Sequence, residues 1–399
     1  MSNNNSNTNN QHLFAEKELA RYSRHLSIDD FGLEAQKKLK RSSVLLIGTG
    51  GLGSPVLSYL AAAGVGKLGI VDFDKVESSN LHRQLLFGES DIGKSKVKAA
   101  EKRLKDINPY VEIEMYETLL TSDNAMDIVA DYDLVIDGTD NFPTRYLVND
   151  VCVFLDKPNV YGSIFQFEGQ VSVFNYVDDE GNRGPNYRDL FPDPPPPGLV
   201  PSCAEAGVLG VLPGIIGSMQ ASEAIKILTD TGDPLSGSLF LFDALSFSTK
   251  TVNVNHNKDN PLTGDNPTIT EPIDYEQFCG MPIGQESHSE QPSEVPEISV
   301  GELNEMMNRG EDFQLIDVRE PHEYEISNMD GKLIPLGRIL ENEEEIEREK
   351  PVVIHCRSGG RSSDAVKQLQ EAYGFDNLYN LRGGINAWAK EVDTSLPVY

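Results

Sequence analysis

Two stretches of this 399-residue sequence combine residue types and spacing that could do chemistry. The first is the glycine-rich run GTGGLG, which follows the apolar run VLLI and opens a segment typical of a helix. Glycines let backbone amides approach a phosphate closely, and the amino end of a helix favours negative charge. The run therefore predicts a nucleotide site that includes Gly48, Gly50, Gly51 and Gly53.

Polar residues after the next predicted strands would extend this site. Asp72 closes the strand KLGIVD, where its carboxylate could accept hydrogen bonds from ribose hydroxyls. Arg83 and Lys96 are cations that could contact a polyphosphate. Asp140 lies in LVIDGTDN at the carboxyl edge of the predicted sheet, where a carboxylate suits Mg²⁺ bound to a triphosphate. The other residues assigned to the nucleotide are Asp74, Ser79, Asn80, Gln84 and Asn141.

Each of these features also has a simpler explanation. The glycine run alone fits a nicotinamide-binding domain equally well. Arg83 and Lys96 are compatible with solvated charges, and Asp140 with a helix cap. The set together favours ATP. An NAD-dependent oxidoreductase is the weaker alternative, because the sequence shows no companion set of residues for handling a hydride.

The second stretch is CRSGGR, in which Cys356 follows an apolar strand and precedes a helical segment. Such a loop points successive amides inward, and two arginines add positive potential, which favours a thiolate and would stabilise a persulfide anion. A buried structural cysteine at a strand end is the alternative, and the polar, cationic surroundings argue against it. The loop residues assigned to this site are Arg357, Ser358, Gly359, Gly360 and Arg361.

The elements that must position these residues alternate between short apolar runs and helical segments from Ser43 onward. This alternation predicts an α/β layer fold with a mostly parallel sheet at its start. Between about residues 256 and 297 the composition becomes typical of a linker, apart from the island IDYEQFCG, which could dock on the first domain. We expect a disordered tail over 1–12, a first domain over 13–280, a linker over 281–296 and a second α/β domain over 297–399.

The composition is that of an ordinary soluble globular protein, with 39% hydrophobic and 24% charged residues. A net charge of −29 argues against a nucleic-acid partner, which would require a basic face. No apolar run is long enough to span a membrane, and the amino-terminal sequence lacks the features of a signal peptide. Because four widely spaced cysteines form no disulfide framework, we expect a reduced, cytoplasmic protein with no membrane partner.

Residues from about Ala20 to Gly280 resemble the MoeB/ThiF family, bacterial relatives of ubiquitin-activating enzymes. The matching strings include RYSRHL, GTGGLGSP, AGVGKLGIVDFDKVESSNLHRQ, GKSKVKAA, DGTDNFPTRYLVND and CAEAGVLGVLPG. The resemblance implies a Rossmann-like domain with a mixed sheet that uses ATP and Mg²⁺, with Asp140 on the metal. It also implies a homodimer in which Arg24 reaches the ATP of the other copy. The substrate would be a ubiquitin-like sulfur carrier protein, whose Gly-Gly tail enters the site and attacks the α-phosphate.

The same resemblance bears on the cysteines. In this family Cys203, in VPSCAEAGVLG, can form a covalent link to the carrier, and a small buried cysteine is the alternative. Many members also carry two C-x-x-C pairs that bind structural zinc. No C-x-x-C occurs in this sequence, so we expect no structural zinc, and Cys152 and Cys279 look structural. The residues found at the places of the zinc cysteines are Asn186, Asp189, Asn260 and Thr263.

Residues from about Glu297 to Val398 resemble a single rhodanese domain, through IDVREPHEYE, the six-residue loop CRSGGR and GGINAW. The resemblance implies a small α/β domain in which Cys356 carries sulfur as a persulfide. It also implies that Asp317 and Arg319 help to hold the loop. Phosphatases of related fold use a loop that is usually one residue longer, so the loop length favours sulfur.

The two resemblances together imply one reaction sequence. The carrier would be adenylated, Cys356 would receive sulfur from a donor such as a cysteine desulfurase, and the persulfide would replace AMP. Reductive cleavage, with Cys203 as the candidate thiol, would release a thiocarboxylate. Two alternatives remain: an activator of a ubiquitin-like protein for conjugation with a non-catalytic rhodanese module, and a second domain that only binds a partner. The sequence leaves open whether molybdopterin, thiamine or cysteine synthesis or tRNA thiolation is served.

Overall fold

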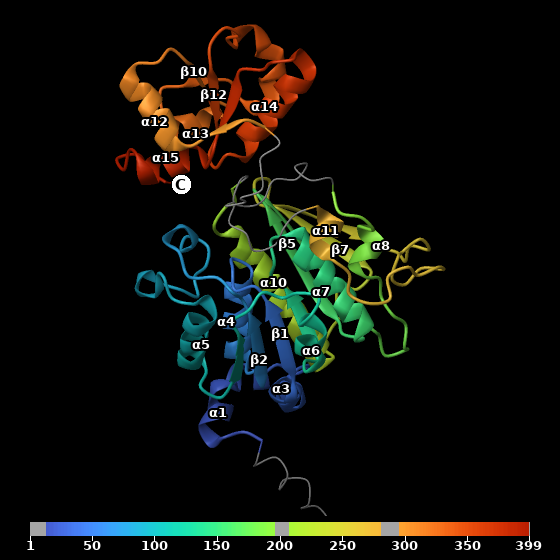
Figure 1. The fold of residues 1–399 in the computed structure, drawn as a ribbon. Coiled ribbons are helices and arrows are strands. Elements are labelled where there is room, and N and C mark those ends of the chain that lie inside the picture. Colours follow the sequence, from blue (N-terminus) through green and yellow to red (C-terminus); the bar gives the residue numbers. More distant parts are fainter. Residues whose placement is uncertain (1–12, 196–206, 281–294, 399) are drawn as a thin grey trace, which may run out of the picture. The chain divides into compact units, whose positions relative to one another are not determined.

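The computed structural model describes residues 13–195, 207–280 and 295–398. The chain divides into two compact units, Met1–Gly284 and Gln285–Tyr399. Each unit is described by itself, and Figure 1 shows the elements of both. Within the described ranges, no helix is both long enough and apolar enough to cross a membrane.

The first unit is built on an eight-stranded sheet with the strand order β3-β2-β1-β4-β5-β6-β7-β8. The strands from β3 to β5 pair in parallel, and those from β5 to β8 pair antiparallel. The predicted α/β fold with a mixed sheet that is parallel at its start is confirmed. The strands are β1 (Ser43–Ile47), β2 (Lys67–Val71), β3 (Glu112–Tyr116), β4 (Leu134–Asp137), β5 (Asn159–Phe165), β6 (Glu168–Phe174), β7 (Ser238–Asp243) and β8 (Ser248–Asn253).

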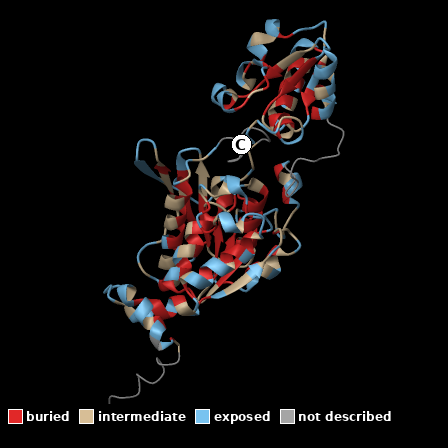
Figure 2. Cartoon of the chain, turned by 90° about the vertical axis from the view of Figure 1, so that its left-hand side faces the viewer, coloured by how far each residue is buried: buried red, intermediate tan, exposed pale blue. Residues whose placement is uncertain are grey.

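Helices cover both faces of the parallel part of this sheet, because its strands are apolar on both sides. Val44 and Leu46 of β1 pack with α4, α5 and α10, whereas Leu45 and Ile47 pack on the other face with α6 and α7. Figure 2 shows the buried residues gathered in the strands and on the helix surfaces against them. The helices are α1 (Glu16–Arg21), α2 (Ser23–Leu26), α3 (Gly32–Arg41), α4 (Gly53–Ala63), η1 (Ser78–Asn80), η2 (Glu89–Asp91), α5 (Lys96–Ile107), α6 (Ala125–Ala130), α7 (Phe142–Phe154), α8 (Tyr187–Leu190), α10 (Leu212–Thr229) and α11 (Tyr275–Cys279).

The island predicted to dock on the first domain forms α11. The hydroxyl of Tyr275 donates a hydrogen bond to Asp150 of α7 at 2.9 Å. The same carboxylate accepts two bonds from Arg188 of α8, each 2.8 Å long. All three side chains are buried. The docking prediction is therefore confirmed: a buried ion pair joins α7 and α8, and the Tyr275 hydrogen bond attaches α11 to it.

The second unit contains a five-stranded parallel sheet with the order β11-β10-β12-β13-β9. Val352 and Ile354 of β12 pack in one core cluster with α14, and Val353 packs in another with α12 and α15. The predicted small α/β domain is thus confirmed, with helices on both faces. Its elements are β9 (Glu297–Ile298), α12 (Val300–Arg309), β10 (Gln314–Asp317), α13 (Pro321–Ile326), β11 (Lys332–Leu333), η3 (Leu336–Arg338), η4 (Leu340–Glu345), β12 (Val352–His355), α14 (Gly360–Tyr373), β13 (Leu378–Leu381) and α15 (Gly384–Glu391).

Candidate functional site

The glycine run forms the turn between β1 and α4, at the carboxyl edge of the parallel strands. Gly48 has a φ of +87°, and a Cβ there would lie 3.0 Å from the carbonyl oxygen of Gly138, which follows β4. A Cβ on Gly53 would lie 2.2 Å from the carbonyl oxygen of Gly48. Close backbone approach therefore requires glycine at both positions.

Asp72, which follows β2, stabilises this turn through hydrogen bonds. Its Oδ2 accepts hydrogen bonds from the backbone amide and the hydroxyl of Thr49, at 2.8 and 2.6 Å. Its Oδ1 accepts a bond from the amide of Asp74 at 2.9 Å. Asp72 thus holds the shape of the glycine turn, and its bond to a ribose stays a prediction. Sequence reasoning missed the role of Thr49, because its partner lies 23 residues away.

Three of the predicted polar residues form one hydrogen-bonded group beside the glycine turn. Asn80 Oδ1 accepts bonds from an Arg83 guanidinium nitrogen at 3.0 Å and from Gln84 Nε2 at 3.1 Å. The Cγ atom of Arg83 lies 3.6 Å from where a Cβ on Gly51 would stand. Gln84 Nε2 lies 3.8 Å from the corresponding point at Gly50. The fold therefore brings these five residues together.

Lys96 is buried at the start of α5, and its ammonium group lies 2.8 Å from Asp74 Oδ2. The Asp74 side chain is 49% exposed. An exposed carboxylate contributes little to an ion pair, so Lys96 can exchange this partner for a phosphate at low cost. Ser79 lies apart from this pair, and its hydroxyl donates to Glu77 at 3.2 Å.

Asp140 and Asn141 have different surroundings after β4. The side-chain oxygen of Asn141 accepts a bond from the amide of Thr144 at 2.9 Å and so caps α7. Asp140 is exposed, and its carboxylate has no hydrogen bond or ion pair with any residue that the structure describes. Asp140 therefore presents an exposed carboxylate at the carboxyl edge of the sheet that is not bound to any of the described residues.

A buried ion pair supports the loop that carries Asp140. Asp137, the last residue of β4, is fully buried, and its Oδ1 accepts a bond from the amide of Thr139 at 2.9 Å. Arg145 Nε lies 3.4 Å from Asp137 Oδ2, and its guanidinium donates to the Thr139 carbonyl at 3.0 Å. A buried carboxylate without a cation is costly, so Arg145 positions this loop. Arg145 lies in the string DGTDNFPTR but is not among the predicted site residues.

Arg24 lies near the carboxyl end of α4, whereas the glycine turn lies at its amino end. Arg24 is exposed on α2, two residues after Tyr22. The Tyr22 ring lies 2.4 Å from where a Cβ on Gly64 would stand, immediately after α4. The glycine turn is at the other end of this 11-residue helix, which is about 16 Å long. The length of α4 thus separates Arg24 from the nucleotide site of its own chain.

The four residues at the places of the zinc cysteines are joined by hydrogen bonds. Asn260 Nδ2 donates to Asp189 Oδ1 at 2.8 Å and to Asn186 Oδ1 at 3.2 Å. Asn186 Nδ2 donates to Thr263 Oγ1 at 2.9 Å. Over the described part of the chain, no group of three or more His, Cys, Asp or Glu residues could hold a metal ion. Amide, carboxylate and hydroxyl groups therefore join the segment 186–189 to the segment 260–263.

In the second unit, Cys356 directly follows β12 and is the first residue of the predicted loop. Its Sγ accepts a hydrogen bond from the backbone amide of Gly359 at 3.1 Å. Gly359 has a φ of +106°, and a Cβ there would lie 3.2 Å from the backbone nitrogen of Gly383. Arg357 is half-buried, whereas Ser358 and Gly360 are exposed. The sulfur therefore lies at the base of a glycine-containing loop that points an amide at it, as stabilisation of an anionic sulfur requires.

Arg361 is paired with an acid that the sequence analysis did not assign. Its guanidinium donates to both carboxylate oxygens of Glu323 on α13, at 2.6 and 2.7 Å. Burial opposes ionisation of Glu323, but the bonds from Arg361 and the Glu320 amide and the charges of Arg361 and Arg319 outweigh burial and lower its pKa. The buried Arg319 pairs with Asp317 at 2.6 Å and donates to the Glu323 carbonyl at 3.3 Å. The Asp317–Arg319 pair thus supports the loop through Glu323 and Arg361.

Of the other three cysteines, the structure describes Cys152 and Cys279. Cys203 lies outside the described residues, so its predicted role stays a prediction. Cys152 and Cys279 are buried free thiols. Burial raises the pKa of Cys279 to about 11 and raises the pKa of Cys152 further. Both thiols are therefore protonated at neutral pH, which agrees with a structural role.

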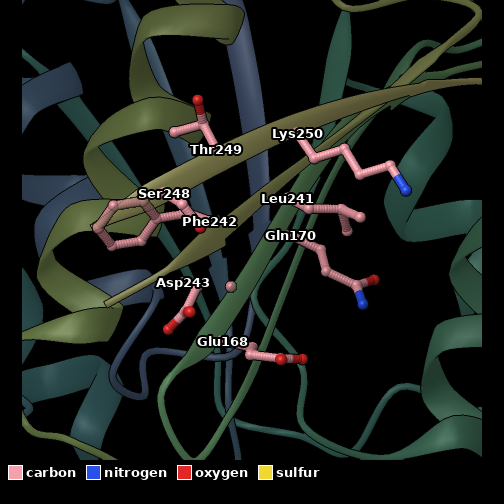
Figure 3. Close-up of a pocket in the computed structure, with 9 residues that line it drawn as sticks. Glu168, Gln170, Leu241, Phe242, Asp243, Ser248, Thr249 and Lys250 are labelled. Carbon is pink, nitrogen blue, oxygen red and sulfur yellow. The ribbon is translucent and has the colours of Figure 1, made fainter. Parts of the chain in front are cut away.

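A pocket elsewhere on the first unit involves none of the predicted residues. It lies between β6, β7 and β8, and Figure 3 shows Glu168, Gln170 and Lys250 among its lining side chains. Because no residue assigned to the nucleotide lines it, this pocket is distinct from the glycine turn.

The fold and the two sites define a class of protein: a nucleotide-binding α/β domain with a phosphate-type glycine turn, joined to a small domain that holds a thiol under an amide loop. Residues 22–263 match the model of the ThiF family, and residues 299–391 match that of the rhodanese-like domain. The chain belongs to the ThiF family, and its second unit is a rhodanese-like domain.

Two relatives match two thirds or more of this chain. The chain is 46% identical over 386 residues to the probable adenylyltransferase/sulfurtransferase MoeZ of Mycobacterium tuberculosis, and the match covers 96% of each chain. It is 54% identical over 268 residues to the sulfur carrier protein adenylyltransferase of Thermus thermophilus, covering 67% of this chain and 99% of the relative.

Solved structures also resemble the first unit. The crystal structure of E. coli MccB with ATP has a TM-score of 0.53 and 21% identity, and the match covers 64% of this chain and 76% of that one. At this identity the likeness shows the fold alone.

Proposed function

We propose that the chain is a sulfur carrier protein adenylyltransferase and sulfurtransferase that converts the C-terminal carboxylate of a ubiquitin-like carrier into a thiocarboxylate. The observation that carries the proposal is that one chain holds both a ThiF-family domain with a glycine turn at its sheet edge and a rhodanese-like domain with an amide bound to the Cys356 sulfur. The relative named adenylyltransferase/sulfurtransferase spans both units, which supports the pairing of the two activities.

In the first step, an oxygen of the carrier's terminal carboxylate attacks the α-phosphorus of ATP, and pyrophosphate leaves. The product is an acyl-adenylate. Repulsion between the carboxylate and the triphosphate must be overcome, so the site has to supply cations and alignment more than proton transfer. We assign this role to Arg83 and Lys96, and the proximity of Arg83 to Gly51 and of Lys96 to Asp74 supports the assignment.

Mg²⁺ fits the residues at the end of β4. The exposed carboxylate of Asp140 is the kind of ligand that Mg²⁺ takes together with phosphate oxygens and water. We assign Asp140 to hold the ion, which would neutralise charge on the triphosphate. Asn141 contributes by capping the helix behind Asp140.

The enzyme acts as a homodimer in this proposal. Arg24 is exposed, and α4 separates it from the glycine turn of its own chain. An Arg24 that contacts nucleotide must therefore come from a second copy. A pocket lined by Phe31 before α3, Tyr59 of α4 and Ile225 of α10 offers apolar surface for such a contact.

In the second step, a persulfide on Cys356 attacks the carbonyl carbon of the acyl-adenylate, and AMP leaves with the bonding electron pair. The product is an acyl disulfide between the carrier and Cys356. Attack of the Cys203 thiolate on the Cys356 sulfur releases the thiocarboxylate and leaves a Cys203–Cys356 disulfide. A thiol reductant then supplies the two electrons that restore both thiols. A cysteine desulfurase or another sulfur donor reloads Cys356, and this need for free thiols favours a reducing, cytoplasmic setting.

The test is to incubate the protein with ATP, a sulfur donor and each candidate glycine-tailed carrier, and to measure intact carrier masses. We expect one or more carriers to gain the mass difference between sulfur and oxygen, and only when ATP is present. Consumption of ATP with carrier conjugates and no thiocarboxylate would instead support activation for conjugation. Failure to consume ATP with every carrier offered would contradict the proposal.

A further inference from the structure

A buried serine next to the active-site loop contacts the Cys356 sulfur. Ser362, in the first turn of α14, is fully buried, and its Oγ lies 3.4 Å from Cys356 Sγ. The same oxygen lies 3.1 Å from the Gly359 carbonyl and 2.6 Å from Asn380 Oδ1. A hydroxyl carries one proton, so these three acceptors compete for a single donor.

Asn380 is held with its oxygen toward Ser362. Asn380 lies on β13 and is buried, and its Nδ2 donates to Glu297 of β9 at 2.9 Å. β13 and β9 are paired in parallel with Asn380 opposite Glu297. Because the amide nitrogen is engaged by an acid, the oxygen must face the serine. The short Ser362–Asn380 bond is therefore set by the strand register.

The protonation state of the sulfur decides where the Ser362 proton points. When Cys356 is a thiol, its S–H can donate to Ser362 Oγ, and Ser362 can donate to Asn380. When the sulfur is a thiolate or a persulfide anion, a hydroxyl donor to the sulfur forms a stronger, charge-assisted bond. The proton then leaves Asn380, whose buried oxygen loses its partner.

We propose that Ser362 is a positioning residue that donates a hydrogen bond to the anionic sulfur of Cys356, and that Asn380 opposes this by competing for the same proton. The proposal deepens the proposed function, since it rests on Cys356 being the sulfur-carrying group. Together with the Gly359 amide, Ser362 would give the anion two donors. Asn380 would set how readily the thiolate forms.

Charged and titratable groups surround the loop on every side. Arg357 and Arg361 belong to the loop, and Glu323, which pairs with Arg361, lies on α13. Asp317 ends β10, Arg319 follows it, and Glu297 lies on β9. His355 precedes the cysteine, and burial lowers its pKa, so it is neutral at pH 7. Replacing Ser362 leaves these groups in place. Asn380→Leu also removes the bond to Glu297, so its effect is compared with and without Ser362 to isolate the hydroxyl proton.

The experiment follows the ¹³Cβ signal of Cys356 by NMR in the full-length protein, labelled at cysteine, as pH is raised. The Cys356 signal is identified by its absence from the spectrum of Cys356→Ser. The measurement needs neither ATP nor a carrier. In Ser362→Ala we expect the midpoint of the Cys356 transition to move up by about one pH unit, because one donor to the thiolate is lost. In Ser362→Thr, which keeps the hydroxyl, the midpoint should stay close to that of the unsubstituted protein.

A second substitution should shift the midpoint of the Cys356 transition in the opposite direction. In Asn380→Leu the competing acceptor is gone, so the midpoint should move down. In a Ser362→Ala background, Asn380→Leu should leave the midpoint unchanged. The serine hydroxyl that Asn380→Leu would otherwise release from its bond to Asn380 is absent there. An unchanged midpoint in Ser362→Ala, or an Asn380→Leu shift that persists without Ser362, would overturn the proposal. If Ser362→Ala does not fold, the sign of the Asn380→Leu shift decides. Failure of the proposed function would appear separately, as absence of thiocarboxylate in a protein whose midpoints shift as expected.

Discussion

The guanidinium of Arg361 donates to both carboxylate oxygens of Glu323, at 2.6 and 2.7 Å, and so joins the end of the Cys356 loop to α13. The loop cysteine lies five residues before this arginine. An acid on one side of the guanidinium offsets much of its positive charge. Arg361 therefore holds the loop in place in addition to any potential it lends to the sulfur, and the loop depends on an acid that lies far away in the sequence.

We predict that Glu323→Gln lowers the free energy of unfolding of the second unit by about 1.5–3 kcal/mol, because two bonds to a charged group are weakened. Trp388 is the single tryptophan of the chain and is buried in a core cluster of the second unit. Its fluorescence during denaturation therefore reports this unit alone. The control is Glu305→Gln on α12, which breaks an exposed pair with Arg309 and should cost about 0.5 kcal/mol or less. Equal effects of the two substitutions would contradict the structural role of Glu323.

The lowered pKa of Glu323 predicts a direction of pH dependence. A carboxyl whose pKa is lower in the folded than in the unfolded state adds stability above the unfolded value, about 4.3 for glutamate. This contribution is lost as the pH falls toward the lower folded value. The stability difference between the unsubstituted protein and Glu323→Gln should therefore be full near neutral pH and shrink below about pH 4. Trp388 fluorescence at several pH values measures it, and a difference that grows on acidification would show the sign to be wrong.

Gly53→Ala should disrupt the nucleotide turn. The added Cβ would lie 2.2 Å from the carbonyl oxygen of Gly48, so the backbone must move. Overpacking of this kind costs about 1–3 kcal/mol or more, and it should also weaken ATP binding. Calorimetry of unfolding and of ATP binding measures both effects. Gly88→Ala is the matched control, because its Cβ would meet nothing within 4 Å. Normal ATP binding by a folded Gly53→Ala protein would contradict our account of this turn.

Asp140→Ala should abolish carrier-dependent pyrophosphate exchange while the protein stays folded. The exposed carboxylate makes no bond that its removal would break among the described residues, so stability should change by less than about 0.5 kcal/mol. Asp131→Ala, at the carboxyl end of α6 and before β4, is an exposed control that should keep full exchange. Near-normal exchange by Asp140→Ala would rule out the assignment of Asp140 to the metal and nucleotide.

The hydrogen bonds at the places of the zinc cysteines predict stability without metal. Asn260→Ala removes the bonds to Asp189 and Asn186 and should lower the unfolding free energy by about 1–3 kcal/mol. Asn255→Ala, exposed on the same segment, should have little effect. Calorimetry measures both, and prolonged treatment with a chelator should leave the unfolding temperature of the unsubstituted protein unchanged. Stoichiometric zinc in the purified protein would refute this reading.

The parts of the structure that sequence reasoning predicted are those whose signal is local. The glycine run and the CRSGGR loop each lie between a strand and a helix within one short stretch, so their chemistry and position could be read together. The mixed α/β fold, the second α/β domain and the family resemblances are confirmed for the same reason, since strand and helix patterns repeat over a few residues.

The residues that sequence reasoning missed act across long separations. Glu323 binds an arginine 38 residues away, and Asn380 meets a serine 18 residues away. No local pattern marks such partners, because strand order in the folded sheet brings them together. Asn141 shows the opposite case: a residue in a family motif whose side chain serves a helix cap. The four side chains that replace the zinc cysteines could be located in the sequence, but their direct bonding required the fold.

The central claim is that sulfur held on Cys356 moves to a carrier that the first unit has activated. The most direct measurement is a single turnover in which Cys356 is loaded with isotopically heavy sulfur, the donor is removed, and carrier and ATP are added. We predict that the intact carrier gains the heavy sulfur in place of oxygen, in an amount matching the loaded persulfide, and that Cys356→Ser gives none. A carrier that forms thiocarboxylate without the heavy label, or with Cys356→Ser, would contradict the claim.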